Sequence, residues 1–305
     1  MKIYSGIGDK NLKSRPRSIA VGIFDGVHRG HQKILRCMLV RAKSRRRRSI
    51  IVTFDPHPMK VLAHDPKISI LMSLRHRLRV FGKTGADETL VIPFNKAFSK
   101  ISAGAFLKNI LIKKLGMKSL CVGHDFRFGH KGLGDLAFLK SMARRLGFRL
   151  SVIPALKKSG EIISSTRVRR LIEKGELRKA ERMLGRPVSV YGDVVPGRGR
   201  GRGLGFPTAN LNPHHETLPP SGVYAVKAYW RNRLLKGVVH LGARPTFGEK
   251  DRSVEVHLLN FHKNIYGEEL ELLFMKKLRG IKKFKSRQEL SRRIRLDIRQ
   301  ASLLL

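Results

Sequence analysis

The sequence predicts an α/β domain followed by a small antiparallel β-barrel and a C-terminal helix. In the first part, short apolar runs rich in β-branched residues alternate with amphipathic stretches long enough for helices, as in a parallel sheet with helical crossovers. Past Gly185, short strand-like segments are separated by Gly- and Pro-rich turns, which is typical of an antiparallel sheet or barrel. A chain of 305 residues has room for two domains. We place them at 1–184 and 185–305.

The first domain is expected to alternate strands with helices. The strands are expected at Ser18–Phe24, Ser49–Phe54, Thr89–Pro93, Ser119–Val122 and Arg149–Ile153. The helices are expected at Gly30–Arg46, Leu74–Thr84, Ala103–Leu115 and Leu133–Leu146. A helix pair, Arg167–Lys174 and Leu177–Leu184, is expected to break at Gly175.

The second domain is expected to be almost entirely strands. They are expected at Val188–Val195, Gly222–Trp230, Arg233–Leu241, Ser253–Phe261 and Leu270–Leu278. A last helix is expected over Ser286–Leu303, with Ser286 as its N-cap and Glu289 completing a capping box.

The charge balance is strongly basic, with 64 Lys and Arg against 22 Asp and Glu and a net charge of +42. Such a field attracts anions, including nucleotides and nucleic acid. The basic residues are spread along the whole chain, so non-specific anion or RNA binding is expected rather than a specific nucleic-acid site. Cys37 and Cys121 have no metal-ligand spacing and are expected to be buried thiols in a reducing cytoplasm. No signal peptide or membrane-spanning run is evident.

A Gly- and His-rich segment, residues 22–31, leaves the first strand and opens the first helix. The helix N-terminus offers N–H donors to a phosphate, and His28 and His31 flank Gly30 so that both can face it. Nucleotidyl transfer needs fixed donors for the charge that develops on phosphate oxygens. The alternative is a pair of solvent-exposed turn histidines. The other candidate phosphate-binding residues of this segment are Gly22, Phe24, Asp25, Gly26 and Gly30.

Two later segments also follow strands of the predicted parallel sheet, where ligands gather. Asp55 and Pro56 end the second strand, and Asp125, Phe126 and Phe128 follow the fourth. The two rings can stack a flat heterocycle, although each alone would more often be core packing.

Hydroxyls and guanidiniums open the helix that follows the last strand of the first domain. Ser164, Ser165, Thr166 and Arg169 form an arrangement that suits a triphosphate. Simple N-capping with a solvated face is the alternative.

A glycine-laced loop in the second domain runs directly into Thr208 and Asn210. Alternate glycines can wrap a nucleotide, whereas an Arg-Gly repeat can also be a disordered RNA-binding segment. Thr208 and Asn210 offer neutral oxygens on one face of an extended segment, where Mg²⁺ can bridge to phosphate. The loop glycines expected to bind phosphate are Gly197, Gly199, Gly201 and Gly203.

Glu255 alternates with Val254 and Val256 on a predicted strand, so its side chain is expected to point away from theirs. Phosphoryl transfer to an alcohol is helped by a base within reach of the attacking hydroxyl. An exposed strand glutamate is the alternative.

These segments resemble, in type, order and spacing, the motifs of the bacterial bifunctional riboflavin kinase/FAD synthetases. The resemblance covers roughly residues 18–300. It implies an N-terminal nucleotidyltransferase domain of the His-x-Gly-His type that adenylylates FMN to FAD, and a C-terminal barrel that phosphorylates riboflavin to FMN, each with ATP and Mg²⁺. It also implies that His28 and His31 stabilise the transition state, that Glu255 is the base, that Thr208 and Asn210 bind the metal, and that Arg279 lies near the flavin.

The resemblance further implies the residues that shape the flavin side of the adenylylation site. They are Asp55, Pro56, Asp125, Phe126 and Phe128. Two positions depart from the family pattern: Asn260 stands where many members have aspartate, and Ile281 stands where an acid usually follows Arg279 by two. We expect the missing acid to loosen the orientation of Arg279. The alternative function is a basic RNA-associated protein on a nucleotidyltransferase scaffold, and the sequence leaves the oligomeric state open.

Overall fold

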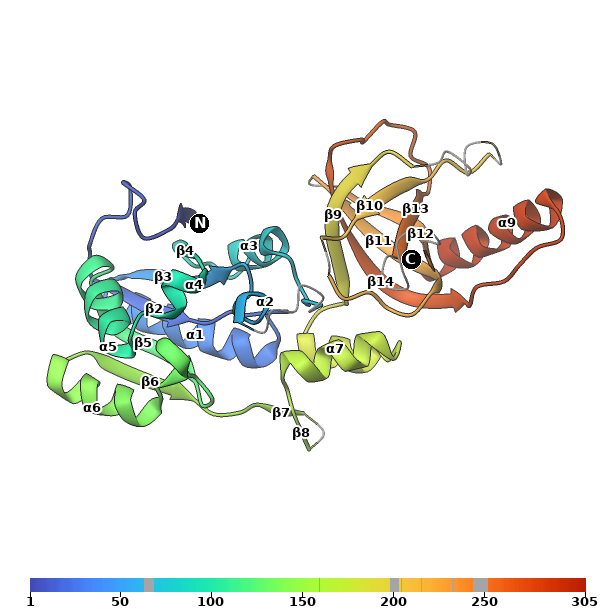
Figure 1. The fold of residues 1–305 in the computed structure, drawn as a ribbon. Coiled ribbons are helices and arrows are strands. Elements are labelled where there is room, and N and C mark those ends of the chain that lie inside the picture. Colours follow the sequence, from blue (N-terminus) through green and yellow to red (C-terminus); the bar gives the residue numbers. More distant parts are fainter. Residues whose placement is uncertain are drawn as a thin grey trace. The chain divides into compact units, whose positions relative to one another are not determined.

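The computed structural model describes residues 1–62, 69–158, 160–197, 203, 205–214, 216–231, 233–243 and 252–305. The chain divides into two compact units, one of Met1–Ile70 with Arg77–Ser165 and one of Leu71–His76 with Thr166–Leu305. The first contains a parallel α/β sheet and the second a closed antiparallel barrel with a C-terminal helix (Figure 1). The predicted fold class is confirmed.

A six-stranded, fully parallel sheet with the order β1-β4-β3-β2-β5-β6 forms the centre of the first unit. After β1 at one edge, the chain forms β2 in the middle of the sheet and adds β3 and β4 on the side toward β1. It then crosses to the other side of β2 and adds β5 and β6. The carboxyl edge between β2 and β5 is therefore the switch point at which parallel sheets bind ligands. Strand β1 was not expected, because its four residues are too few to give a periodic signal. The strands are β1 (Lys2–Ser5), β2 (Arg17–Val21), β3 (Arg48–Asp55), β4 (Glu88–Pro93), β5 (Met117–Gly123) and β6 (Arg149–Ile153).

Helices cover both faces of this sheet. Helix α1 (Arg29–Ser44) packs on β2, β3 and β5 with its buried apolar residues. The main apolar core lies on the other face, beneath η1 (Phe106–Lys114) and α6 (Leu136–Leu146). The expectation of one α-helix over 103–115 is wrong, because most of this segment is a π-helix. A short α5 (Ala103–Ala105) leads into the π-helical η1, whose wider turns end with the Leu115 N–H donating to the Ile110 carbonyl at 3.0 Å.

The remaining elements of the first unit and the two helices that follow are short. Helix α6 begins later than expected, because Asp135 caps it by accepting a hydrogen bond from the Phe138 N–H at 2.9 Å. The break at Gly175, with a φ of 76°, separates α7 from α8. The short elements are α2 (Pro58–Leu62), α3 (Leu74–Gly82), α4 (Lys96–Ser99), η2 (His130–Gly132), β7 (Lys157–Lys158), β8 (Glu161–Ile162), α7 (Ser165–Glu173) and α8 (Leu177–Leu184).

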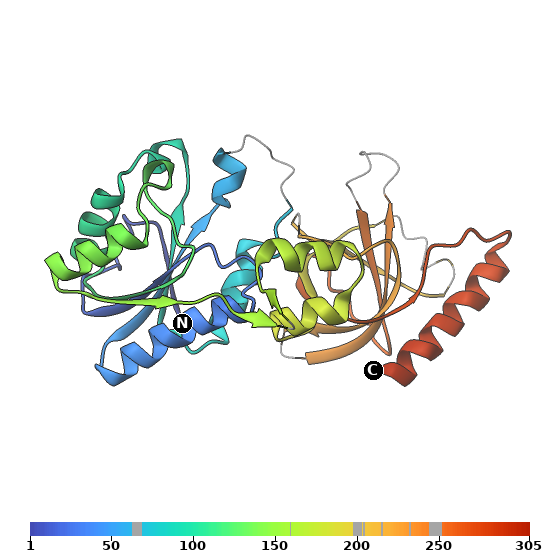
Figure 2. The ribbon, with the colours of Figure 1, turned by 90° about the horizontal axis from the view of Figure 1, so that it is seen from below.

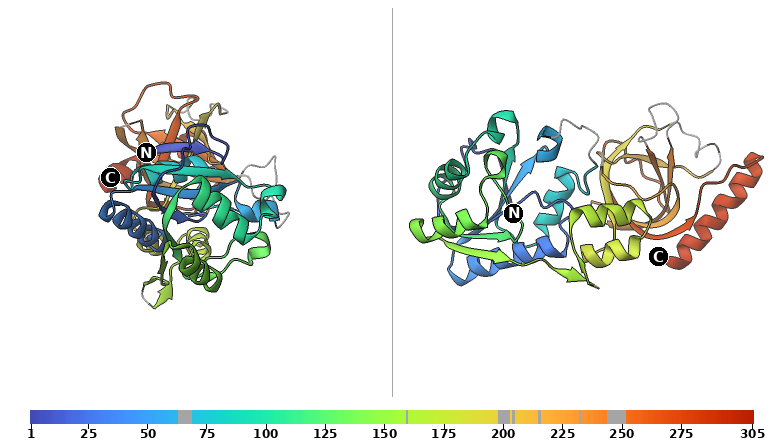
Figure 3. Two further views of the ribbon diagram at one scale, coloured as in Figure 1. Left: turned by 90° about the vertical axis from the view of Figure 1, so that its left-hand side faces the viewer. Right: turned by 60° about the horizontal axis from the view of Figure 1, so that its bottom comes forward.

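The barrel of the second unit closes in the order β10-β13-β12-β11-β14-β9 and is seen best in the right-hand view of Figure 3. Val254 and Val256 are buried inside it, while Glu255 between them is half-buried on the outer side. Strand β10 was not expected, because it is only four residues long. The strands are β9 (Ser189–Val195), β10 (Ala209–Asn212), β11 (Gly222–Trp230), β12 (Arg233–Ala243), β13 (Arg252–Leu258) and β14 (Glu269–Arg279).

Helix α9 (Arg287–Leu304) packs against β11, β12 and β14 (Figure 2). Ser286 is its N-cap, accepting from the Glu289 N–H at 3.1 Å. The Glu289 carboxylate accepts from the Lys285 N–H at 3.0 Å, one residue before the partner that a capping box requires. Within the part of the chain that the structure describes, no helix is both long and apolar enough to cross a bilayer.

Candidate active sites

The two predicted histidines meet at the N-terminus of α1. His28 is the N-cap, and its Nδ1 accepts a hydrogen bond from the His31 N–H at 3.3 Å. The two imidazole rings stack with centroids 3.6 Å apart and an interplanar angle of 19°. A Cβ atom added at Gly30 would lie 3.1 Å from the His28 ring, so the spacing His-x-Gly-His leaves room for the stack. His28 is only 5% exposed, unlike a solvent-exposed turn histidine.

The loop between β2 and α1 is held in unusual backbone conformations. Phe24, Gly26 and Val27 have φ angles of 54°, 79° and 39°. For a β-branched or aromatic residue, this left-handed region costs on the order of 1–3 kcal/mol, and such strain clusters at functional sites. A Cβ atom at Gly22 would lie 2.9 Å from the Phe24 ring. The Phe24 and His31 rings lie edge to face, with their centroids 5.3 Å apart. The tight loop therefore fixes the place of the second histidine.

The predicted Ser164–Arg169 segment lies partly beside this loop. Ser165, at the start of α7, donates from its hydroxyl to the carbonyl of the buried Asp25 at 2.8 Å. The Ile163 carbonyl is 3.9 Å from the position of a Cβ atom at Gly30. Ser164 directly precedes α7, while Thr166 and Arg169 lie further along the helix and belong to the second unit.

The neighbouring strand ends contribute the other predicted residues of the first site. Asp55 is the last residue of β3 and is followed by Pro56. Burial raises the pKa of its carboxyl, although the positive charges of Arg77 and Lys60 act to lower it. Asp125 follows β5 and is exposed. β3 and β5 flank β2 in the sheet, so these carboxylates and the histidines share one edge.

The two predicted aromatic residues have a structural role. The rings of Phe126 and Phe128 stack at 5.3 Å with an angle of 20°, and both pack against the apolar core. Phe128 also contacts the rings of Phe106 and Phe138, at 5.8 Å and 6.1 Å. Core packing, the alternative considered from sequence, therefore accounts for part of their positions.

Arg77 is a residue of this region that sequence reasoning missed. Its buried guanidinium donates from Nη1 to the Ile23 carbonyl at 2.7 Å and to Thr53 Oγ1 at 2.9 Å. Its Nη2 donates to the Phe54 carbonyl at 3.1 Å. Arg77 thus joins the β2 and β3 ends that carry the site. Its helix contains several basic residues, and nothing in their pattern singles out the buried one.

In the second unit, five directly paired residues form a row across the barrel, which we call the barrel row. Cross-strand pairing joins Asn210 to Glu255, Glu255 to His240, His240 to Val223, and Val223 to Arg279. Directly opposed residues of an antiparallel sheet share one face. Three residues predicted separately, Asn210, Glu255 and Arg279, are therefore brought onto one side of the barrel.

His240 is a second residue that sequence reasoning missed. It stands between Glu255 and Val223 in the barrel row. Burial lowers the pKa of its imidazole, and the charge of Arg279 lowers it slightly further. The charge of Glu255 raises this pKa but does not outweigh burial. A lowered pKa favours the neutral ring. Only the pairing of β12 with β13 and β11 identifies His240, and such pairing is not readable from a single segment.

The glycine loop is anchored beside the barrel row. The Pro207 carbonyl lies 2.8 Å from His257 Nδ1. The Phe206 ring lies edge to face with the same imidazole, with the two ring centroids 6.0 Å apart. His257 follows Glu255 by two on β13 and so shares its face. Thr208 is half-buried just before β10. Gly197 and Gly203 are exposed, whereas Gly199 and Gly201 lie outside the described residues.

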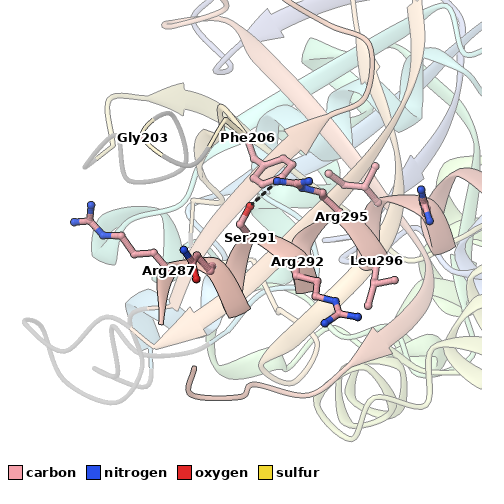
Figure 4. A pocket seen from close by; sticks show the side chains of 10 residues that line it. Gly203, Phe206, Arg287, Ser291, Arg292, Arg295 and Leu296 are labelled. Atoms are coloured by element: carbon pink, nitrogen blue, oxygen red, sulfur yellow. Dashed lines mark hydrogen bonds between the residues drawn. The ribbon is translucent and has the colours of Figure 1, made fainter. Parts of the chain in front are cut away.

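A cavity of about 980 Å³ opens between this loop and α9 (Figure 4). Its wall combines the Phe206 ring with basic side chains of the helix, and Arg295 donates to Ser291 Oγ at 3.5 Å. An aromatic ring beside cationic groups suits a flat, negatively charged molecule such as a nucleotide. The arginines lining the cavity are Arg287, Arg292, Arg295 and Arg299.

The described residues hold no cluster of three His, Cys, Asp or Glu side chains of the kind that cages a metal. Mg²⁺ does not need one, because it keeps several waters and takes its remaining ligands from a few protein oxygens and substrate phosphates. The donors near the barrel row are the hydroxyl of Thr208 and the amide oxygen of Asn210, opposite Glu255. This donor set fits Mg²⁺ bound together with a phosphate chain.

These two sites define an enzyme class: a two-domain phosphate-transfer enzyme with a nucleotidyl-transfer site on a parallel sheet and a phosphoryl-transfer site on a barrel. Residues 10–167 match the sequence model of the FAD synthetase family, and residues 184–305 match that of the riboflavin kinase family. The chain belongs to the family of bifunctional riboflavin kinase/FMN adenylyltransferases. These matches give the RNA-associated alternative no support.

Relatives with that name are similar over the whole chain. The protein of Buchnera aphidicola subsp. Schizaphis graminum is 35% identical over 98% of this chain and 97% of its own length. The protein of Escherichia coli (strain K12) is also 35% identical, over 97% and 96%. A crystal structure from Streptococcus pneumoniae, named as a macrolide-efflux protein, covers 99% of each chain with 27% identity and a TM-score of 0.85.

Proposed function

We infer that the chain makes both flavin cofactors, phosphorylating riboflavin to FMN in the barrel and adenylylating FMN to FAD on the parallel sheet, with ATP as co-substrate of each reaction. The observation that carries this inference is the match of one family model to each half of the chain. The positions of His28 and His31 at the carboxyl edge of the parallel sheet, and of Asn210, Glu255 and Arg279 in the barrel row, support it further. We propose the boundary of the two catalytic domains at 184/185, which the match of residues 184–305 supports.

In the kinase reaction, Glu255 accepts the proton of the riboflavin 5′-hydroxyl as that oxygen attacks the γ-phosphorus of ATP, and ADP leaves. Its outward position in the barrel row, directly opposite Asn210, supports this role. Thr208 and Asn210 would hold Mg²⁺, which would neutralise charge on the phosphate oxygens. We assign the phosphates to the glycine loop, with Gly197, Gly199, Gly201 and Gly203. Arg279, at the far end of the row, faces the flavin or its phosphate.

In the adenylylation reaction, a phosphate oxygen of FMN attacks the α-phosphorus of ATP and expels pyrophosphate. The nucleophile is already ionised, so the site needs positioned donors rather than a strong base. His28, His31 and the N–H groups at the start of α1 supply them at the switch point of the sheet. Ser164, Ser165, Thr166 and Arg169 hold the triphosphate.

The flavin of the second reaction is assigned to the adjacent strand ends. Asp55, Pro56 and Asp125 lie at the carboxyl edge beside the histidine loop, and we assign them to this ligand. Phe126 and Phe128 shape the same side as a stacked pair fixed against the core. Because both reactions consume ATP, we place the protein in the cytoplasm, with small molecules as its partners and only non-specific attraction of other anions.

Two variants test the assignment of two separate sites. Glu255→Gln is expected to abolish FMN formation from riboflavin and to leave the conversion of FMN to FAD intact. The double variant His28→Ala with His31→Ala is expected to do the reverse. Each variant retains the other activity as its internal control for folding. Loss of both activities in either variant, with an unchanged melting temperature, would refute the assignment.

A further inference from the structure

A buried carboxylate on α9 binds the arginine at the end of the barrel row. The Nε of Arg279 donates to both oxygens of Asp297, at 2.9 Å and 3.2 Å. The Asp297 side chain is only 2% exposed, and Arg293, one helical turn earlier, donates from its Nε to Oδ1 at 3.1 Å. A carboxylate removed from water in this way is stable only while its cationic partners stay in place.

The remaining contacts of Arg279 fix its guanidinium from other sides. Nη1 donates to the Gly280 carbonyl at 3.2 Å, and the guanidinium carbon lies 5.5 Å from the centre of the Phe284 ring. No described residue accepts a hydrogen bond from Nη2. With the Nε edge occupied by Asp297, the donors that remain for a ligand are on the Nη side. A planar guanidinium held at one edge presents these donors in a fixed direction.

The contact with Asp297 also shows which acid orients Arg279, although Ile281 supplies none. The resemblance to the family implied that Arg279 lacks its usual acid two residues further on, and Ile281 at that position is exposed and apolar. The acid comes from elsewhere in the chain, 18 residues further on. Helix α9 packs on the three strands β11, β12 and β14, so the barrel itself places Asp297 under Arg279.

We propose that Asp297 is the positioning residue that aims Arg279 at the flavin or its phosphate in riboflavin phosphorylation. The proposal rests on the function inferred above and extends it from β14 to α9. Asp297 touches no substrate and acts only through Arg279. Removing its charge frees the arginine to rotate and weakens the flavin contact, while ATP binding at the glycine loop is unaffected.

The test is the steady-state kinetics of Asp297→Asn. The variant is expected to raise the KM for riboflavin about 10- to 100-fold, the range of one charge-assisted hydrogen bond, with the KM for ATP unchanged. Conversion of FMN to FAD by the same chain is expected to stay at the wild-type rate. The matched control is Glu268→Gln, which breaks another arginine–carboxylate pair, with Arg231, at the opposite end of β11. It is expected to leave the KM for riboflavin unchanged.

A double-mutant cycle separates positioning from a purely structural role. In an Arg279→Lys background, Asp297→Asn is expected to add no further increase in the KM for riboflavin. Equal effects of Asp297→Asn in both backgrounds would overturn the proposal, as would an unchanged KM in the single variant. Where the asparagine variant does not fold, Asp297→Glu keeps the charge and moves the carboxylate. It is expected to raise the KM by a smaller factor, and an unchanged KM again overturns the proposal. A wild-type chain that does not phosphorylate riboflavin would refute the proposed function itself.

Discussion

Of the two described glycines of the glycine loop, Gly197 has the clearer steric reason to be a glycine. A Cβ atom added there would lie 2.6 Å from Cγ of Asn210, whereas ordinary contact begins near 3.4 Å. Gly197→Ala must therefore move the Asn210 side chain by roughly 1 Å, and a misplacement of that size in a reacting group costs about 100-fold. Gly203 in the same loop has open space around its Cβ position among the described atoms, so Gly203→Ala adds a methyl group to this loop without displacing Asn210.

The assay is FMN formation from riboflavin at saturating ATP and Mg²⁺. We expect Gly197→Ala to lower kcat about 100-fold, and Gly203→Ala to lower it by a smaller factor. Neither position has a positive φ, so the alanine backbone itself is tolerated and the melting temperatures are expected to agree. FAD formation from FMN reports on the other domain. A Gly197→Ala enzyme with wild-type kinase activity would refute the role given to Asn210.

Three further predictions concern groups away from the reacting atoms. Cys37 is half-buried rather than buried as expected. A hydrogen bond from Cys121, with Sγ atoms 3.2 Å apart, lowers the pKa of Cys37 to about 6. Iodoacetamide should therefore modify Cys37 half-maximally near pH 6, and a rate still rising at pH 9 would contradict this. Burial alone would lower the pKa of His76, but the carboxylates of Glu216 and Glu271 outweigh burial and raise the pKa overall. The free energy of unfolding should therefore fall as pH rises above about 6.5. Glu216→Gln should cost about 3–5 kcal/mol in chemical denaturation and weaken this pH dependence. Arg77→Met should slow FMN adenylylation and leave riboflavin phosphorylation unchanged, and equal loss of both would contradict its placement.

Local pattern was enough to predict most of the fold. Apolar runs and amphipathic stretches indicated β2 to β6 and the helices α1, α3 and α6, because burial on one face imposes a period that one segment already shows. Ser286 was found as a cap from its own neighbours. Among the elements that were missed, β1 and β10 are four residues long and pair with strands far away in the chain.

The candidate sites divide in the same way. His28 and His31 lie three residues apart, so their meeting at one helix end could be predicted. Arg77 and Asp297 could not, because each is one charged residue among many on a basic helix and only its long-range partners distinguish it. The departure of Ile281 from the family pattern led us to expect a loosely oriented Arg279. The arginine is held by a residue whose approach depends on how α9 packs on the barrel.

One incubation tests the whole account most directly: purified protein with riboflavin, ATP and Mg²⁺, followed by chromatographic separation of the flavins over time. FMN is expected to form first and FAD to follow from it, with ADP and pyrophosphate as the respective co-products. Riboflavin left unchanged, together with no conversion when FMN is supplied instead, would contradict the account.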